Sequence, residues 1–441
     1  MTAAVAKKVK RIDAKRAGMK IGDNDERTGS PVKRPAFQEK SSLIRLRSEE
    51  IPLPASLQVS IEDVATNYIL FSYSNSSSFV YLATDDGRYT ATVLLNRAVL
   101  LAPALALLSR QTQQPGILDQ ARQKYVEAVV STNLALSNRS SARTDSTLLS
   151  VLLLALYEAT VFRGRELPTG WTTHTLGAAA LLSLRGTEQF YTPLGRALFM
   201  HAASSIRASC LQRKRSVPPV LVAFHGLMPP QSEQVRDPAF AVMPILDEVA
   251  DLLKEFCDPS FKSSQTFQES VAALNKKVAL LIDVMQETWP YEVVDKSKEH
   301  KTHRYSSYHS ARHWNMLRMT RILVNGMLIQ LAADNSSFIK CGSVIYGIES
   351  LVSLSEDLAR NILASVPYLL NTAHNSVTVA AQCLLWPLYM VASCRRISVY
   401  AAGEARHQLE LLHRNFGIPQ AREALNMPKE RTLTDWYAIH S

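Results

Sequence analysis

From about residue 60 onward, apolar side chains recur with the spacing of helices, and this pattern continues almost to the end of the chain. Segments such as 117–138 and 265–289 carry apolar residues three or four positions apart, which places them on one helical face. Only 16 of the 441 residues are glycine, and no series of short alternating segments indicates strands. We therefore predict an all-α protein whose large multi-helix domain spans residues 59–441.

The first 58 residues differ from the rest in charge and in apolar content. Residues 1–50 hold 13 Lys and Arg against 7 Asp and Glu, so they contribute +6 of the net charge of +10. No apolar period is sustained there, and we predict a disordered basic leader over residues 1–58. It could contact DNA phosphates without sequence preference, act as a nuclear-import signal, or simply be solvated. The candidate residues for import or phosphate contact are Lys7, Lys8, Lys10, Arg11, Lys15, Arg16, Lys33 and Arg34.

Nothing in the sequence predicts secretion or insertion into a membrane. The N-terminus lacks the apolar core of a signal peptide. The run Val377–Cys394 has nearly the length of a membrane span, but it contains Gln382 and Pro387, which favours a buried core helix. The 5 cysteines are far apart and odd in number. They predict free thiols in a reducing compartment rather than a disulfide framework.

Glycine spacing suggests a phosphate-binding loop at one place, Gly342–Gly347. Such a loop binds the anion through backbone N–H groups and a lysine that follows the second glycine. Ile348 and Glu349 stand where lysine and serine or threonine would be, and a carboxylate repels phosphate. We therefore reject a nucleotide-binding loop here.

Two other groups of polar residues resemble parts of metal sites. Asp85 and Asp86 lack the third aspartate of a magnesium motif, so together with Gly87 they predict a turn. His309 and His313 have the i, i+4 spacing of zinc ligands on a helix. Lysine and arginine surround them, which favours a solvated polar loop leading into a helix. We predict no catalytic residue, no cofactor, no metal and no enzymatic activity.

The segment WTTHTLGAAALLSLRG predicts a packing helix rather than an active site. A helix there places Trp171, His174 and Arg185 along one broad face. Gly177 and the alanines that follow it leave room for another helix to cross closely. Gly186 can adopt the left-handed conformation that ends a helix. His174 then needs only a hydrogen-bonded neighbour in a partly buried position.

Further segments follow this helix in a recognisable order: WNMLRMTRI, with Trp314 and Arg318, then LLWPLYMVASC, with Trp386 and Pro387, then GIPQAREAL. Taken together, the set resembles the C-terminal regulatory domain of fungal-specific transcription factors of the six-cysteine, zinc-cluster class. The resemblance covers about residues 60–430. It implies a large all-α domain, a nuclear location and control of transcription by RNA polymerase II, without catalysis.

One departure from that family concerns its DNA-binding module. The resemblance implies an N-terminal zinc cluster, in which two C-x2-C-x6-C repeats hold two zinc ions. Here the first cysteine is Cys210, and no C-x-x-C pair occurs. Sequence-specific DNA binding is therefore not carried over. An upstream exon could be missing, the protein could act through partners without the module, or the domain could serve another use.

These observations predict a nuclear regulator of RNA polymerase II transcription, for instance of a metabolic pathway. Its expected partners are the transcription machinery or other regulators, DNA at most non-specifically through the leader, and a small-molecule effector, with no membrane contact. The alternative is a helical adaptor or ligand-sensing protein with no direct DNA contact. A third hypothesis, an enzyme, would require polar residues that converge in a pocket.

Overall fold

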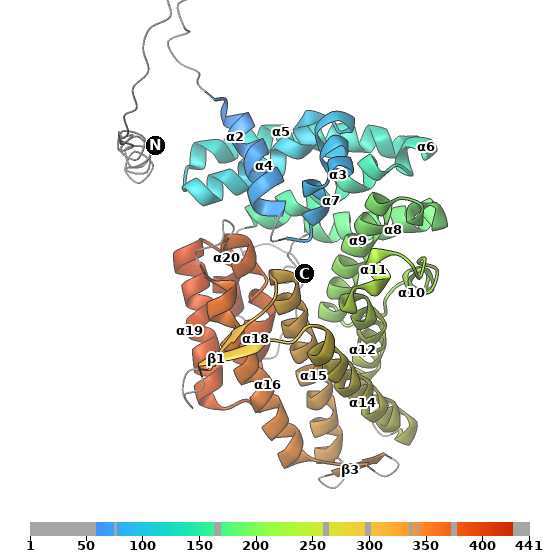
Figure 1. Cartoon of the computed structure of the whole chain (residues 1–441), viewed down its shortest axis with the longest axis vertical. Coiled ribbons are helices and arrows are strands. Elements are labelled where there is room, and N and C mark those ends of the chain that lie inside the picture. Colours follow the sequence, from blue (N-terminus) through green and yellow to red (C-terminus); the bar gives the residue numbers. More distant parts are fainter. Residues whose placement is uncertain are drawn as a thin grey trace, which may run out of the picture. The chain divides into compact units, whose positions relative to one another are not determined.

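Helices make up nearly all of the regular structure in the computed structural model, which confirms the all-α prediction (Figure 1). The described residues belong to one compact unit that runs from Gln58 onward. The predicted leader, residues 1–58, lies outside the described residues, as do all of its basic side chains. The structure describes residues 59–74, 77–162, 169–258, 264–295, 301–334, 338–341, 344–371 and 377–426.

The elements follow one another with short connections. The first half contains α2 (Ile61–Asn67), η1 (Tyr68–Tyr73), η3 (Val80–Ala83), α3 (Asp85–Tyr89), η4 (Thr90–Leu94), α4 (Arg97–Thr112), α5 (Pro115–Ser137), α6 (Arg139–Ala142), α7 (Asp145–Val161), α8 (Thr169–Arg185), η5 (Gly186–Phe190) and α9 (Pro193–Gln212). The second half contains α10 (Pro219–His225), α11 (Glu233–Arg236), η6 (Pro238–Ala241), α12 (Val242–Phe256), α14 (Gln265–Thr288), α15 (Tyr308–Asp334), α16 (Ile348–Leu369), α17 (Val377–Gln382), α18 (Leu385–Ser393), α19 (Val399–Phe416) and α20 (Pro419–Asn426).

Neighbouring helices in the sequence are mostly neighbours in space. Figure 1 shows α2–α7 as a layer across the top, α8–α14 descending on one side and α15–α20 on the other. Helices α4 and α7 are buried over most of their length, which explains why both are apolar around their surface. The end of the domain returns to this layer, because buried Gln420 donates a hydrogen bond to the carbonyl of Ala159 in α7 (2.8 Å).

Local sequence signals fix several helix ends. The side chain of Ser60 accepts a hydrogen bond from the backbone N–H of Asp63, so it caps α2. Gly186 has a φ of +61° at the end of α8, which confirms its predicted left-handed conformation. Pro103 does not split its helix, because α4 runs through it from Arg97 to Thr112.

Two short antiparallel hairpins were not expected from the sequence. One joins β1 (Glu292–Asp295) to β2 (Thr302–Arg304), and the other joins β3 (Phe338–Cys341) to β4 (Val344–Gly347). Strands of three or four residues are too short to show an alternating period. The segment that we rejected as a phosphate loop therefore includes β4.

The prediction of a turn at Asp85–Gly87 is wrong, because these residues form the first turn of α3. Thr84 caps this helix by accepting a hydrogen bond from the N–H of Gly87 (3.1 Å). Glycine is needed there for close packing rather than for an unusual dihedral angle. A Cβ at Gly87 would lie 1.9 Å from the backbone oxygen of Tyr81.

The run Val377–Cys394 forms two helices, α17 and α18, instead of the single core helix that we predicted. Leu385–Ala392 of α18 are all buried, so the core location is confirmed for that part. Among the described residues, no single helix is both long and apolar enough to cross a membrane. By length and composition alone, one bent pair could do so: Asp85–Leu94 with Arg97–Thr112, bent by 108°.

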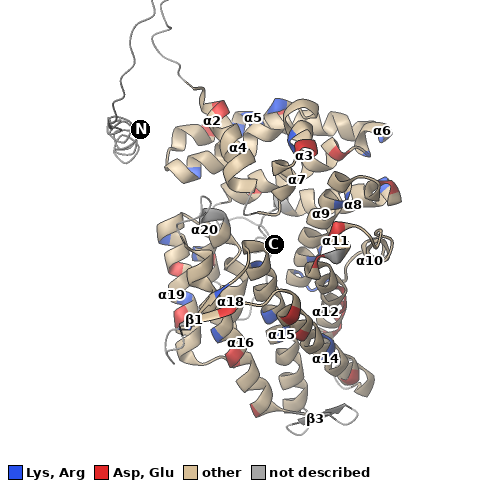
Figure 2. Ribbon diagram, viewed as in Figure 1, with Lys and Arg blue, Asp and Glu red and all other residues tan. Residues whose placement is uncertain are grey.

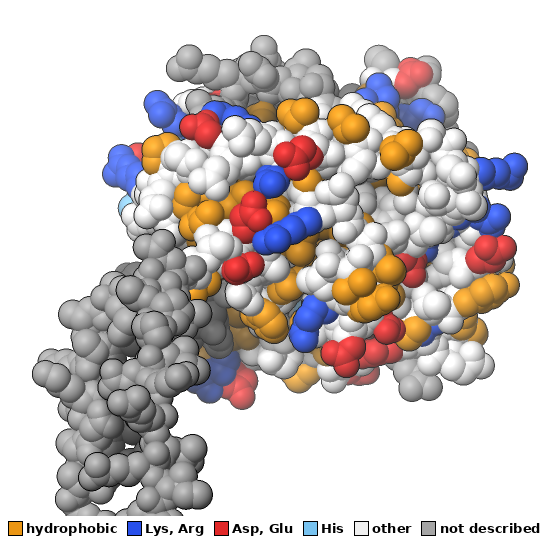
Figure 3. Space-filling model, turned by 90° about the horizontal axis from the view of Figure 1, so that it is seen from above, with side chains coloured by type: hydrophobic (Ala, Val, Ile, Leu, Met, Phe, Trp, Pro, Cys, Tyr) orange, Lys and Arg blue, Asp and Glu red, His pale blue; other side chains and the backbone are white. Residues whose placement is uncertain are grey.

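Charged and apolar residues are mixed on the surface of the described helices. Figure 2 shows Lys and Arg interspersed with Asp and Glu along them. Viewed from above, Figure 3 shows apolar patches between the charged side chains. On α5, Val126, Val130 and Leu134 are 63%, 65% and 74% exposed.

Two alanine substitutions test whether close packing decides where glycine is required. We expect Gly87→Ala to lower the free energy of unfolding by about 1–3 kcal/mol, because the new Cβ must displace the backbone of Tyr81. Gly177→Ala in the middle of α8 should raise it by about 0.5–1 kcal/mol, because a Cβ there meets nothing within 4 Å. Urea denaturation measures both, and equal effects of the two variants would contradict this assignment.

Candidate ligand-binding cavity

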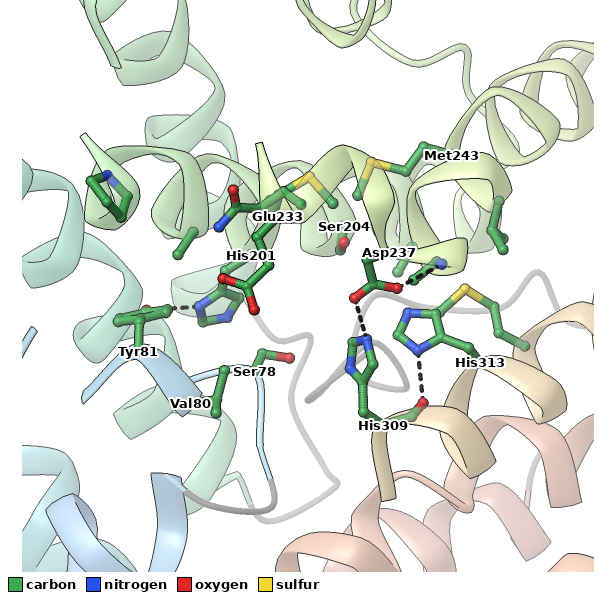
Figure 4. A pocket seen from close by; sticks show the side chains of 18 of the residues that line it. Ser78, Val80, Tyr81, His201, Ser204, Glu233, Asp237, Met243, His309 and His313 are labelled. Carbon is green, nitrogen blue, oxygen red and sulfur yellow. Dashed lines mark hydrogen bonds and ion pairs between the residues drawn. The ribbon is translucent and has the colours of Figure 1, made fainter. Parts of the chain in front are cut away.

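A cavity of about 650 Å³ lies among η3, α3, α9, α11, α12 and α15 (Figure 4). Its volume falls within the range of about 300–1,000 Å³ that is typical of sites for small molecules. The first lining residue in the sequence is Ser78 and the last is Trp386, so segments far apart in the sequence meet there. This is the strongest candidate for a functional site in the described part of the chain.

Apolar side chains of α9 and α12 form one wall of the cavity. On α9 the lining residues Ala197, Ser204, Ala208 and Leu211 are three, four or seven positions apart, so they share one face. The opposite face of α9, with residues such as Phe199, packs into the core. Helix α12 adds further apolar residues to the same wall: Val242, Met243 and Leu246.

A buried ion pair holds α9 against α12 beside this wall. The guanidinium of Arg207 donates from Nε to Oδ1 of Asp247 (2.7 Å) and from Nη2 to Oδ2 (2.9 Å). Arg207 is 0% exposed and Asp247 is 6% exposed. The two parallel hydrogen bonds hold the helices together and also fix the distance between them.

His201 of α9 lies at one end of the cavity. Its Nδ1 is 2.9 Å from the hydroxyl of Tyr81, and its ring packs edge-on against Phe79 with centroids 4.5 Å apart. Burial, with a smaller effect from the charge of Arg312, lowers the pKa of His201 to about 3. The imidazole is therefore neutral at physiological pH, and it offers a hydrogen-bonding group without a charge.

His309 and His313 lie at the other end, on the first turns of α15 (Figure 4). Nε2 of His309 is 2.8 Å from Oδ2 of Asp237. Nδ1 of His313 donates to the backbone oxygen of His309 (2.8 Å), and burial holds the pKa of His313 well below its usual value. Among the described residues, no group of three His, Cys, Asp or Glu side chains could hold a metal ion.

The interpretation of the preceding residues as a solvated loop is wrong. His303 is 3% exposed, and its ring lies against Tyr291 with centroids 4.3 Å apart. Its Nδ1 is 3.1 Å from the hydroxyl of Tyr305. Burial, and to a smaller extent Arg318, lowers the pKa of His303 to about 3. The sequence looks polar here, but His and Tyr can bury their rings as long as their polar atoms are hydrogen-bonded. The segment therefore forms part of an aromatic cluster.

Carboxylates are the charged groups that line the cavity. Asp85 and Asp86 are exposed on α3, Glu233 is exposed on α11, and Asp237 is half-buried before η6. No Lys or Arg belongs to the lining among the described residues. The guanidinium groups of Arg312 and Arg196 are not part of the lining, but each donates a hydrogen bond to a lining residue. Arg312 donates to Oγ of Ser78 (3.1 Å), and Arg196 donates to Oε1 of Gln234 (3.1 Å).

The structure places the segment WTTHTLGAAALLSLRG in α8, outside this cavity. Nε2 of His174 is 3.5 Å from the hydroxyl of Tyr125, and burial lowers the pKa of His174 to about 4. This confirms a partly buried imidazole with a hydrogen-bonded neighbour. His174 also lines a second, much smaller cavity of about 30 Å³, which His201 shares. Trp171 lies in α8, and its side chain is outside the described part of the structure.

Two other residues of α8, Arg185 and Gly177, were expected to take part in helix packing, and the structure places only Arg185 in such a contact. Arg185 is 3% exposed, pairs with Asp145 and donates to the backbone oxygen of Arg143 (3.1 Å), which ties the end of α8 to the start of α7. The expected close crossing at Gly177 is wrong, because a Cβ there would meet nothing within 4 Å. Gly170 makes the close contact instead: a Cβ on it would lie 2.5 Å from Cδ of Glu158.

The remaining motif residues are buried in the second half of the domain. Trp314 donates from Nε1 to the backbone oxygen of Trp289 (2.8 Å). Arg318 is 2% exposed, lies over the rings of aromatic neighbours that include Trp314, and donates to the hydroxyl of Tyr305 (2.7 Å). Trp386 and Pro387 are buried in α18. Trp386 also lines the cavity, as does Met316 of the WNMLRMTRI segment.

Sequence reasoning missed most of this site. It compared His309 and His313 with zinc ligands and favoured a solvated loop leading into a helix, and it interpreted Asp85 and Asp86 as a turn rather than a magnesium motif. The one local signal was the presence of polar residues such as His201 within the apolar α9. Nothing in the sequence pairs that helix with residues of α3, α11 and α15.

No model of a known protein family matches the chain, and no curated protein and no solved structure matches it either. The function must therefore be inferred from the cavity and from the sequence motifs.

The Arg207–Asp247 pair allows a matched test of what fixes the cavity wall. We expect Arg207→Met to lower the free energy of unfolding by about 3–5 kcal/mol, because it leaves the Asp247 carboxylate buried without its partner. The double variant Arg207→Met, Asp247→Leu should recover most of that loss. Chemical denaturation measures both, and a single variant as stable as the wild type would contradict the burial of this pair.

Acid should destabilise the domain, in part through His201. Its folded-state pKa of about 3 lies below the usual value of 6.5, so the unfolded state takes up the proton first as the pH falls. Its contribution to stability is therefore complete above pH 6.5 and is lost as the pH falls toward 3. When the pH is lowered from 7 to 5, the free energy of unfolding should fall in both proteins. The fall should be about 1–2 kcal/mol smaller in His201→Asn than in the wild type. Denaturation at the two pH values measures this, and equal losses would contradict a neutral, buried His201.

Proposed function

We propose that the helical domain is the ligand-sensing part of a regulator of RNA polymerase II transcription. The observation that carries this proposal is the cavity of about 650 Å³, which joins an apolar wall to a few fixed polar groups. The hydrogen-bonded pairs His201–Tyr81 and His309–Asp237 hold those groups in place. Such an arrangement suits recognition of a small molecule, which the family resemblance also leads us to expect.

The position of the cavity suggests how a ligand would act. Its lining comes from both halves of the domain, from Ser78 before η3 to Trp386 in α18. A ligand that contacts these segments together favours the arrangement in which they are close. A change in their spacing would then alter the surfaces that the domain presents to partners. The extent of the shift is set by the difference in ligand affinity between the two arrangements.

The location and partners in this proposal rest on the sequence. The motifs of α8, α15 and α18 resemble those of a nuclear regulatory domain, and we propose the transcription machinery or other regulators as partners. The basic leader supports nuclear import or a sequence-independent contact with DNA phosphates, which would weaken steeply as salt rises. The lack of any C-x-x-C pair favours a second candidate, a ligand-sensing adaptor that reaches DNA only through partners.

A cavity-filling substitution tests the proposal in cells that naturally make the protein. Ser204 of α9 lines the cavity, and Ser204→Phe should occupy the space without removing a charged group. Ser270→Phe on the exposed face of α14 is the matched control. We expect loss of the whole gene to change a defined set of transcripts, and Ser204→Phe to change the same set, while Ser270→Phe behaves as the wild type.

Transcript sequencing is the readout, and circular dichroism of each purified variant shows that it is folded. An unchanged transcript set after gene loss would overturn the role in transcription. If gene loss alters transcripts but folded Ser204→Phe matches the wild type, the cavity has no part in that role.

A further inference from the structure

We propose that the ligand of this cavity is an amphipathic organic cation, with a protonated amine that the Glu233 carboxylate binds and an apolar body that lies against α9 and α12. This inference rests on the proposed ligand-sensing function and specifies its substrate class. Three features of the lining carry it: an unpaired carboxylate, the charge of the surrounding groups, and an apolar wall with an unused donor.

Glu233 supplies the contact for the amine. It stands at the start of α11, and Figure 4 shows its carboxylate directed over the cavity toward His201. The side chain of Glu233 makes no ion pair or hydrogen bond with another described residue. The other carboxylate that Figure 4 labels, that of Asp237, is already bonded to His309 and to the backbone N–H of Ala239. Glu233 is therefore available for a charge-assisted hydrogen bond to a ligand, on the side of the cavity next to His201.

The surrounding charges disfavour an anionic ligand. Four carboxylates line the cavity, and no Lys or Arg does so among the described residues. His201 and His313 add no positive charge, because burial keeps both imidazoles neutral. Arg312 and Arg196 are not part of the lining, although each donates a hydrogen bond to a lining residue, Ser78 and Gln234 respectively. A ligand carboxylate or phosphate would lose its water without gaining a cationic partner.

The rest of the lining suits an apolar body that carries a hydrogen-bond acceptor. The wall from α9 and α12 is aliphatic, and Met316 of α15 extends it. Trp386 also lines the cavity and is 6% exposed, yet its indole N–H has no hydrogen-bond partner among the described residues. Buried donors are rarely left unbonded, so this N–H is available to an oxygen of the ligand.

A series of probes with one alkyl chain separates charge from apolar contact. The probes are n-octylamine, 1-octanol and sodium octanoate, titrated into the full chain at neutral pH by isothermal calorimetry. We expect octylamine to bind at least about tenfold more tightly than octanoate, with octanol between them, because only the amine pairs with a carboxylate. Ser204→Phe should abolish binding of all three probes, which places them in this cavity.

Glu233→Gln provides the decisive variant. It should weaken octylamine binding about tenfold and leave octanol unchanged, because only the ion pair is removed. Glu287→Gln, at an exposed position of α14 outside the lining, should change neither. Circular dichroism confirms folding of each variant.

Several outcomes would overturn the assignment. Octanoate or octanol binding as tightly as octylamine would do so, as would octylamine binding that is indifferent to Glu233→Gln, or no binding by any probe. None of these results would remove the ligand-sensing role itself, since that role depends on how Ser204→Phe alters transcripts.

Discussion

The buried pair between Arg207 and Asp247 is the interaction on which the cavity depends most directly. It links α9 to α12 through two parallel hydrogen bonds, and neither residue is appreciably exposed. Removing two charges from water is costly, so the pair is tolerated only where its geometry is nearly ideal. This requirement fixes the separation of the two helices. The apolar wall of the cavity consists of the adjacent faces of the same helices.

Among the described residues, the polar groups around that wall include no Lys or Arg. Burial makes His201 and His313 neutral, while Asp237 is satisfied by His309. The exposed carboxylates of the described lining are those of Asp85, Asp86 and Glu233. The domain thus combines a core in which α4 and α7 are mostly buried with a cavity whose exposed charged residues are carboxylates, among the described residues.

The fold class followed from local pattern, and so did several details. The helical period predicted an all-α domain, and Gly186 took the expected conformation. Errors occurred where the signal was short or ambiguous. Three- and four-residue strands have no measurable period, and His303 looked solvated although an aromatic cluster buries it. The cavity was not predictable, because its lining comes from segments that no local rule pairs.

The sequence by itself determined that the domain is helical and that the helix before Gly186 ends there. These properties depend on neighbours within a few residues, which the sequence displays directly. Only the tertiary structure decided that Arg207 meets Asp247, that His201 stays neutral and that Glu233 faces a cavity. Each of these depends on desolvation and on contacts between distant segments, and both arise only when the helices pack together.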